Sequence, residues 1–339
     1  MLKRYLAAVL ALVMLPICFA ACGEKKEDVY EEIPAANVAT DPDMRQTVLY
    51  YEDDYGFIVP VMKEIKWVEG IGAAAVSELR ANPDADAEME YMGLNPILAA
   101  DTELSLSIKD GAATLKLSKG AITAEDATGE KAKVTAVVNT LAEFPTIDTV
   151  KIVQEGADGK LANGTDISKS FAAFDLNVMT TLSEEDLSNA SKVMLYFIDE
   201  SEAAIVPVTK YIGGTADAYA AMNEFVRGPG CHGLKSLLPD GTKLLNVEID
   251  KAGVATVEFS PEFATIEEDA DKEAKLIKCI VFTLRQFDNI DEVRILVNGE
   301  EYKSTAETTM STKFVNIINP VIAGTNTAGV DAPDENITE

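Results

Sequence analysis

The chain has 339 residues, 47% of them hydrophobic, which is enough to build two domains of ordinary size with packed cores. Lys and Arg total 29 against 57 Asp and Glu, a net charge of −28. Such an acidic surface repels phosphate backbones and argues against nucleic acid as a partner. It is also repelled by anionic lipid headgroups, so membrane association would need a covalent anchor.

Residues 1–21 read as a secretory signal peptide. Lys3 and Arg4 precede an apolar run over 6–17 that is too short to span a bilayer comfortably. The segment ends in FAACG at 19–23, which resembles a bacterial lipobox with Phe where Leu is usual. The resemblance implies cleavage before Cys22, lipidation of its thiol and anchoring on the outer face of the cell membrane. An ordinary signal peptide with an incidental cysteine is the alternative.

The segment 22–46 is charged, contains proline and has no hydrophobic period, which predicts a flexible tether. Beyond it, Cys231 and Cys279 are the two remaining cysteines, and the sequence leaves open whether they form a disulfide. The single histidine, His232, follows Cys231, and no CxxC or HxxxH spacing occurs. We therefore expect no metal site and no cofactor.

The rest of the chain contains an internal repeat. TLAEFPTIDTVKIVQEG at 140–156 and TLRQFDNIDEVRILVNG at 283–299 are identical at eight of 17 positions. Other segments match in the same order, at an offset that drifts from about 140 to 147. Two homologous domains are predicted, over 47–156 and 192–303. A connection at 157–191 joins them, and a C-terminal arm with a disordered tail follows at 304–339.

The second copy has the clearer pattern of elements. Strands are expected at 192–198 and 203–212, and Pro207 places the latter at a sheet edge or bulge. Thr215 is the expected N-cap of a helix that stops at Gly228-Pro229-Gly230. Two strands, a helix and a last strand are expected to follow, at 243–250, 254–260, 271–286 and 292–297.

Each copy is therefore predicted to have the order ββαββαβ. The long helix has an apolar face at i, i+3, i+4 and i+7 spacing in both copies: Val134, Val137, Val138 and Leu141, then Ile277, Ile280, Val281 and Leu284. Phe287, Ile290, Val293 and Ile295 are the expected core anchors after it. This predicts an α+β fold of two tandem small α/β sandwich domains, with helices on one face of a small, mostly antiparallel sheet.

Apolar residues return after each copy, which predicts an extra strand or an extended arm that packs on the neighbouring domain. Those after the first copy include Phe171 and Phe174. Those after the second are Phe314, Val315, Ile317 and Ile318.

No catalytic pattern is present. GxSxG, SxxK, P-loop and GxGxxG motifs are missing, and the first copy has no histidine. Glu267-Glu268-Asp269 is expected in a solvated loop, and no EF-hand loop occurs. The positions matched between the copies are apolar, turn, Pro or Gly residues, so we expect no shared polar constellation and no enzyme activity.

The second copy resembles the GerMN domain of sporulation and germination lipoproteins in spore-forming bacteria. The resemblance rests on LYF followed by IVPV, a helix ending in RGPG, the segment LLPDGTKLLNVEIDKAGVATVEFSPEF and the stretch from TLRQF to ILVNG. It covers about 110 residues of the second copy, and the first copy is more divergent. The whole chain therefore looks like a lipoprotein with two tandem GerMN domains.

The resemblance implies domains similar to ring-building motifs, which pack side by side in secretion-type rings, and carries over no catalytic residue. It implies a scaffold outside the membrane that helps to assemble an envelope complex in sporulation or germination. Its expected partners are other envelope or ring-forming proteins. A lipoprotein that binds a small solute or cell-wall fragment is the alternative. Trp67 and the tyrosines are its candidate pocket residues, although packing in the core or at its rim is the preferred interpretation of these side chains. Partner identity, oligomeric state, the process served and the rigidity between the domains stay open.

Overall fold

The computed structural model describes residues 43–82, 87–180, 182–305, 310–311 and 318–321. The predicted signal peptide, the lipidation site Cys22 and most of the tether lie outside these residues, as do Phe314, Val315 and Ile317. The first strand begins at Met44, two residues before the predicted end of the tether at residue 46. All the described residues belong to one compact unit of the chain, 42–339.

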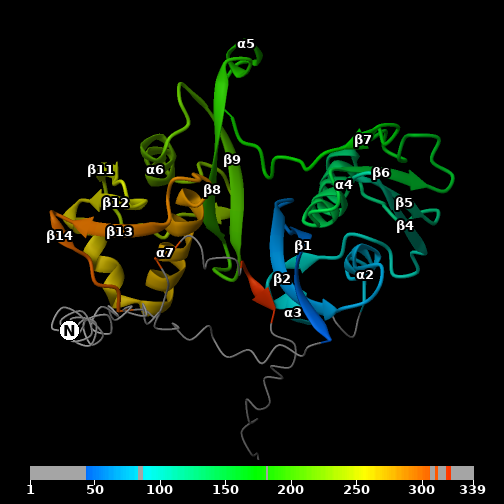
Figure 1. The fold of residues 1–339 in the computed structure, drawn as a ribbon, viewed down its shortest axis with the longest axis horizontal. Helices are drawn as coiled ribbons and strands as arrows, with labels where there is room; N and C mark the ends of the chain where they lie inside the picture. The colour runs from blue at the N-terminus through cyan, green and yellow to red at the C-terminus, as the bar shows by residue number, and fades with distance from the viewer. Residues whose placement is uncertain (1–42, 83–86, 181, 306–309, 312–317, 322–339) are drawn as a thin grey trace, which may run out of the picture. The chain divides into compact units, whose positions relative to one another are not determined.

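The first copy starts with a long hairpin and ends with a crossover unit (Figure 1). Its elements are β1 (Met44–Asp53), β2 (Ile58–Lys66), α2 (Ile71–Ser77), α3 (Ala87–Tyr91), β3 (Leu94–Asn95), β4 (Leu104–Lys109), β5 (Ala112–Leu117), α4 (Ala127–Ala142), β6 (Thr149–Gln154) and β7 (Ser170–Phe171). The connection to the second copy holds a one-turn helix, α5 (Glu184–Leu187).

The second copy follows the same plan. Its elements are β8 (Ala190–Asp199), β9 (Ile205–Gly213), α6 (Ala218–Arg227), β10 (Leu234–Lys235), β11 (Leu244–Ile249), β12 (Val254–Phe259), the 3₁₀ helix η1 (Pro261–Glu268), α7 (Ala270–Leu284), β13 (Glu292–Val297) and β14 (Glu300–Glu301). A last short strand, β15 (Pro320–Val321), follows in the C-terminal arm.

The predicted α+β class and the tandem arrangement are confirmed, with one refinement. The strands of each copy divide between two sheets instead of forming one: β15-β2-β1-β3 and β4-β5-β6-β7, then β10-β8-β9 and β11-β12-β13-β14. The pairs β5–β6 and β12–β13 are parallel, because α4 and α7 carry the chain back across the sheet. Most other pairs are antiparallel, as expected.

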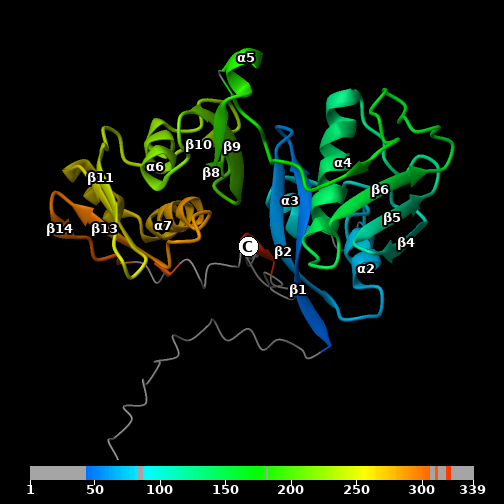
Figure 2. The same ribbon diagram turned by 45° about the horizontal axis from the view of Figure 1, so that its top comes forward.

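The long helices bury the faces that their apolar spacing predicts. All eight residues named for those faces are at most 2% exposed. Helix α4 contacts β1 and β6, and α7 contacts β8 and α6, as Figures 1 and 2 show. Ile290, Val293 and Ile295 are buried, while Phe287 is half-buried against the same core.

Two local predictions were wrong. The N-cap of α6 is Asp217 and not Thr215, because the Asp217 carboxylate directly precedes the helix and accepts from the Ala220 N–H at 2.8 Å. Glu267 and Glu268 end the 3₁₀ helix, and Asp269 caps α7 by accepting from Lys272 N. These three residues do face solvent, but they end one helix and cap the next instead of forming a loop.

Candidate functional site

The two copies meet along strands β2 and β9, which contact each other. Each strand carries a proline at the equivalent position, Pro60 in β2 and Pro207 in β9. A proline has no N–H to donate to a neighbouring strand, so it interrupts a regular hydrogen-bond ladder. Side chains and arms from other parts of the chain make the hydrogen bonds at this junction.

The arms after the two copies are exchanged. The arm of the first copy follows β9 of the second, where Thr209 N donates to Leu176 O at 3.0 Å and Met179 N donates to Thr209 O at 2.8 Å. The arm of the second copy follows β2 of the first, where Met62 N donates to Ile318 O at 2.9 Å and β15 pairs in parallel. The prediction of an arm that packs on the neighbouring domain is confirmed.

An asparagine in each arm bridges the two copies. Asn319 accepts from Ile205 N at 2.7 Å and donates to Ile205 O and Pro60 O, both at 2.8 Å. Asn177 accepts from Ile58 N at 2.8 Å, and it donates to Ile58 O at 2.8 Å and to Pro207 O at 2.7 Å. The two sets are related by the repeat, since Ile58 and Pro60 correspond to Ile205 and Pro207.

Both asparagines have a left-handed backbone, with φ of 49° at Asn177 and 45° at Asn319. Asparagine tolerates this region better than other residues with a Cβ, because its short polar side chain can bond locally. The same residue type therefore satisfies the backbone conformation and the bridging hydrogen bonds at both places. We call these two residues and their partners the asparagine bridges.

The hairpin turns beside the junction contain a second repeated pair, Asp53 and Asp199, each 7% exposed. Asp53 accepts from the N–H groups of Tyr55 and Phe57 at 2.9 and 2.8 Å, and Asp199 accepts from Ala204 N at 2.8 Å. Burial raises the pKa of Asp53 to about 6, against the opposing backbone hydrogen bonds, and the charge of Asp199 adds to the increase. The second oxygen of Asp53, Oδ2, is buried without a hydrogen-bond partner.

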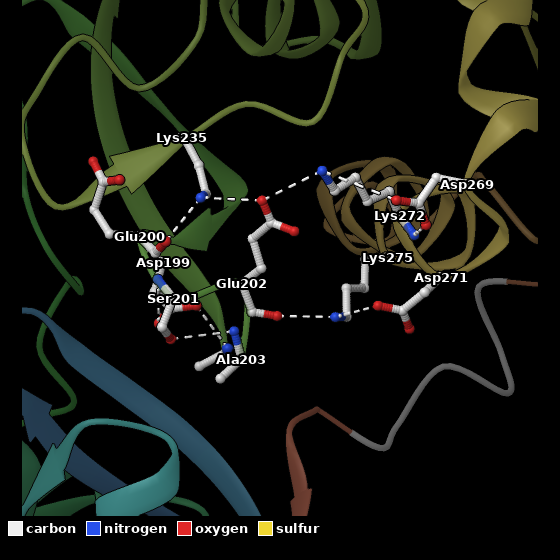
Figure 3. A network of polar contacts seen from close by, with 11 residues as sticks. Asp199, Glu200, Ser201, Glu202, Ala203, Lys235, Asp269, Asp271, Lys272 and Lys275 are labelled. Carbon is white, nitrogen blue, oxygen red and sulfur yellow. Dashed lines mark hydrogen bonds and ion pairs between the residues drawn. The ribbon is translucent and has the colours of Figure 1, made fainter.

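The turn of the second hairpin is fastened to α7 by a charged network (Figure 3). Glu202 Oε1 lies 3.1 Å from Lys235 Nζ and 3.6 Å from Lys272 Nζ, and its carbonyl oxygen accepts from Lys275 Nζ at 2.9 Å. The hydrogen bond from Lys235 is the main cause that lowers the pKa of Glu202. The ammonium groups of Lys235, Lys272 and Lys275, which Figure 3 shows around Glu202, thus hold the turn in place.

Glu202 has the left-handed φ of 61°, where the first hairpin has Gly56 with φ of 83°. A left-handed conformation is easy for glycine and costs energy for a glutamate. The three lysines around Glu202 therefore compensate a strained turn. This network has a structural role.

Aromatic side chains complete the junction. The centroids of the His232 and Tyr55 rings are 5.1 Å apart. Because His232 is the only histidine of the chain, its ring reports on the contact between the copies. Gly233 follows it with φ of 93°, and a Cβ at this position would lie 2.6 Å from Tyr55 Cγ. Glycine is therefore required here for the close approach as well as for the backbone angle.

A hollow of about 280 Å³ lies elsewhere in the first copy and is lined by residues that include Tyr51, Lys63, Glu78 and Arg80. Its cations are already paired: Lys63 Nζ lies 2.8 Å from Glu78 Oε2, and Arg80 donates to the carbonyl groups of Ser77 and Thr102. Trp67 does not line this hollow and is 60% exposed. Trp67 therefore lies outside this hollow and is not packed in the core.

Within the described ranges, no three His, Cys, Asp or Glu side chains are grouped as a metal ion would need. No helix in the same part of the chain is long and apolar enough to cross a membrane. Cys231 and Cys279 are free thiols, the first half-buried and the second buried. Burial raises the pKa of Cys279 to about 12, which makes it unreactive near neutral pH.

The expectation of no shared polar constellation was wrong. Six polar pairs occupy equivalent places in the two copies: Asp53 and Asp199, Lys63 and Lys210, Glu78 and Glu224, Glu130 and Glu273, Thr140 and Thr283, and Asn177 and Asn319. Thr140 and Thr283 lie inside the duplicated stretch that was interpreted as apolar. Each hydroxyl accepts from the backbone N–H of the neighbouring strand, at Tyr50 and Tyr196 respectively.

The buried carboxylates Glu130 and Glu273 fasten the segment that follows each copy. Glu130 accepts from Asn163 N at 2.7 Å and from Thr165 N at 3.1 Å. Glu273 accepts from the Tyr302 hydroxyl at 2.8 Å and from Thr305 N at 3.0 Å. Burial opposes ionisation of Glu273, but these hydrogen bonds lower its pKa. The repeated polar groups thus hold strands, turns and arms together, and none is arranged as a nucleophile with a base.

Residues 48–160 and 194–303 match the Germane family model, described as sporulation and spore germination. The chain belongs to the Germane (GerMN) family. Each matched range begins inside the first strand of the hairpin and contains the complete crossover unit, β4 to β6 in the first copy and β11 to β13 in the second. This confirms the family that the sequence motifs indicate, including the divergent first copy.

The protein GerM of Bacillus subtilis illustrates the relationship, both in sequence and in structure. The spore germination protein GerM of Bacillus subtilis (strain 168) is 29% identical over 290 residues, which are 82% of this chain and 77% of that protein. The solved structure of the tandem GerMN domains of the sporulation protein GerM from Bacillus subtilis has a TM-score of 0.59 and 26% identity. It covers 78% of this chain and 99% of that one. GerM is described as a protein of sporulation and spore germination.

Proposed function

We propose that this chain is a lipid-anchored, extracytoplasmic assembly protein whose two GerMN domains act as one element in sporulation or germination. The exchange of arms across the junction carries this proposal. Each edge strand, β2 or β9, is covered by the arm of the other copy, and the asparagine bridges join both copies. A solute-binding protein directs polar side chains into a pocket, whereas Asn177 and Asn319 fix one domain to the other.

The same use of polar groups supports a protein without enzyme activity. The hollow in the first copy has its cations paired, and the charged network around Glu202 holds a turn. Family membership supports a role in sporulation or germination, since the related protein GerM is named for these processes. Other envelope or ring-forming proteins are the proposed partners, and the acidic net charge of −28 is unfavourable for nucleic acid.

The anchor is tested by fractionating cells that produce the full chain or its Cys22→Ala variant. Lipidation at Cys22 predicts that the unaltered chain stays with the membrane, because two acyl chains give stable binding. The variant should be released to the medium. Equal membrane retention of both proteins would overturn the anchoring proposal.

The assembly role is tested by photo-cross-linking in sporulating cells, from probes placed at the exposed Tyr91 and Tyr219. We expect a defined envelope protein in the cross-links. The yield should fall when Asn177→Gly and Asn319→Gly together weaken the junction, while the amount of the chain stays unchanged. An absence of cross-links, together with a cell-wall fragment that raises the melting temperature, would instead establish the solute-binding alternative.

A further inference from the structure

An exposed apolar and cationic surface lies where the described chain begins. Trp67 is 60% exposed and Val68 is 45% exposed, directly after the end of β2. The Arg45 guanidinium lies over the Trp67 ring at 4.9 Å from its centroid, and Lys66 is exposed beside it. We call these four residues the Trp67 patch.

The duplication provides an internal control for this surface. Strand β9 has the same length as β2, and the residues equivalent to Lys66, Trp67 and Val68 are Gly213, Gly214 and Thr215. The residue equivalent to Arg45 is Ser191 in β8. The second copy therefore folds without any member of the patch. Packing of the GerMN fold does not explain why the first copy exposes a tryptophan here.

The patch also lies at the entry of the segment that leads from Cys22. The Trp67 N–H donates to Asp43 O at 2.7 Å, and Asp43 is the first described residue. Twenty residues separate Cys22 from Asp43, a length that reaches at most about 70 Å when fully extended. A link of this length holds the patch near its anchor point at an effective concentration of order millimolar.

We infer that the Trp67 patch inserts into the headgroup region of the lipid bilayer and seats the first GerMN domain on the membrane. Tryptophan favours this region because its ring is apolar while its indole N–H stays hydrogen-bonded. Arg45 and Lys66 can contact lipid phosphates while their aliphatic stems stay near the ring. This inference rests on the proposed anchoring at Cys22.

The overall charge defines when the patch can act. Asp43 and Glu69 are exposed close to it, and the whole chain carries −28. Long-range repulsion from anionic lipids therefore opposes binding of the free protein. We expect the patch to contact lipid when the anchor holds it there, and the released Cys22→Ala protein not to bind vesicles.

Trp67 is the only tryptophan of the chain, so its fluorescence reports on the patch alone. The lipidated full-length mature protein is reconstituted into phosphatidylcholine vesicles with brominated or ordinary acyl chains. Interfacial side chains enter roughly 5–10 Å into the headgroup and acyl boundary. We expect the brominated chains to quench about half of the emission, with a reduced quenching by acrylamide in the aqueous phase.

The matched control moves the tryptophan to the second copy. The double variant Trp67→Tyr with Tyr219→Trp places it on α6, where the native side chain is 50% exposed. Its emission should stay unchanged in brominated vesicles. Both substitutions are at exposed positions, and an unchanged unfolding midpoint verifies that the control protein is folded.

The outcomes separate the two proposals. If the protein floats with the vesicles and Trp67 is quenched no more than the control tryptophan, the seating is wrong and the anchoring stands. If the lipidated protein does not float, the anchoring itself fails. If Trp67 of the Cys22→Ala protein is already protected from acrylamide without vesicles, another part of the chain covers the patch and the inference is overturned.

Discussion

Removing the side chain of Asn319 should loosen the contact between the two GerMN domains. Asn319 is 8% exposed and makes three hydrogen bonds of 2.7 to 2.8 Å to Ile205 and Pro60. Each such bond contributes a net of about 1 kcal/mol. We therefore expect Asn319→Gly to lower the free energy of unfolding by about 3 kcal/mol. Glycine keeps the left-handed backbone, so this change isolates the side-chain bonds.

Two matched variants separate the causes. Asn319→Ala removes the same bonds and also strains the backbone, because φ is 45° at this position. It should cost a further ~0.5–1 kcal/mol. Asn177→Gly removes the corresponding three bonds at a half-buried position. Water can replace them more easily there, so the expected loss is only about 1–2 kcal/mol.

The assay combines urea unfolding with one proton resonance. Unfolding followed by circular dichroism gives the free energy, and the ring protons of His232 report on its contact with Tyr55. Asn319→Gly should shift the His232 resonance toward that of an isolated histidine. A change below about 0.5 kcal/mol, with the resonance unmoved, would refute the view that the asparagine bridges join the copies.

Three further predictions concern the repeated polar groups. The native pKa of Asp53 is about 6, above the ordinary 3.8. The native state therefore binds the proton more tightly than the unfolded state, and the protein loses stability as pH rises from 4 to 6 and Asp53 ionises. Asp53→Asn should raise the free energy of unfolding by roughly 1–2 kcal/mol at pH 7.5, after allowance for solvent screening, and by far less at pH 4. Thermal unfolding at both pH values measures this, and an equal increase at pH 7.5 and pH 4 would contradict the prediction. Thr283→Val leaves the Tyr196 N–H unpaired and should lower the free energy of unfolding by about 1–2 kcal/mol, measured in urea. Thr283→Ser keeps the hydroxyl and should keep most of the stability of the unaltered chain. Glu202→Gly relieves the left-handed backbone strain but loses exposed ion pairs, so its free energy of unfolding should stay within about 0.5 kcal/mol of that of the unaltered chain. Glu202→Ala keeps the strain and loses the same pairs, so it should lower the free energy of unfolding by about 1 kcal/mol. A larger loss for the glycine variant would mean that the ion pairs contribute more to stability than the strain costs.

Local patterns predicted much of the fold because they reflect local geometry. The i, i+3, i+4, i+7 apolar sets identified the buried faces of α4 and α7, and the match between 140–156 and 283–299 identified the duplication. Thr215 failed as an N-cap because several residues of similar capping preference stand close together there. Only the position at which the helix begins selects Asp217.

The polar half of the repeat was missed for a different reason. Asp53 and Asp199 are acidic residues at hairpin turns, which normally face solvent, and their burial to 7% exposure is decided by the tertiary structure. A signal for the asparagine bridges was present in the sequence. An apolar residue precedes an asparagine after each copy, in Leu176-Asn177 and Ile318-Asn319. These pairs are too short to stand out from chance without the structure.

The sequence by itself determined the family, the two copies, their helices and most of their strands. Each of these depends on neighbouring residues along the chain, through apolar periods and turn residues. The tertiary structure alone decided the exchange of arms, the buried carboxylates and the exposure of Trp67. The arms and the buried carboxylates depend on contacts between residues that are not neighbours in the sequence, such as Glu130 and Asn163 with a separation of 33 and Pro60 and Asn319 with a separation of 259. Such contacts leave no periodic trace in the sequence.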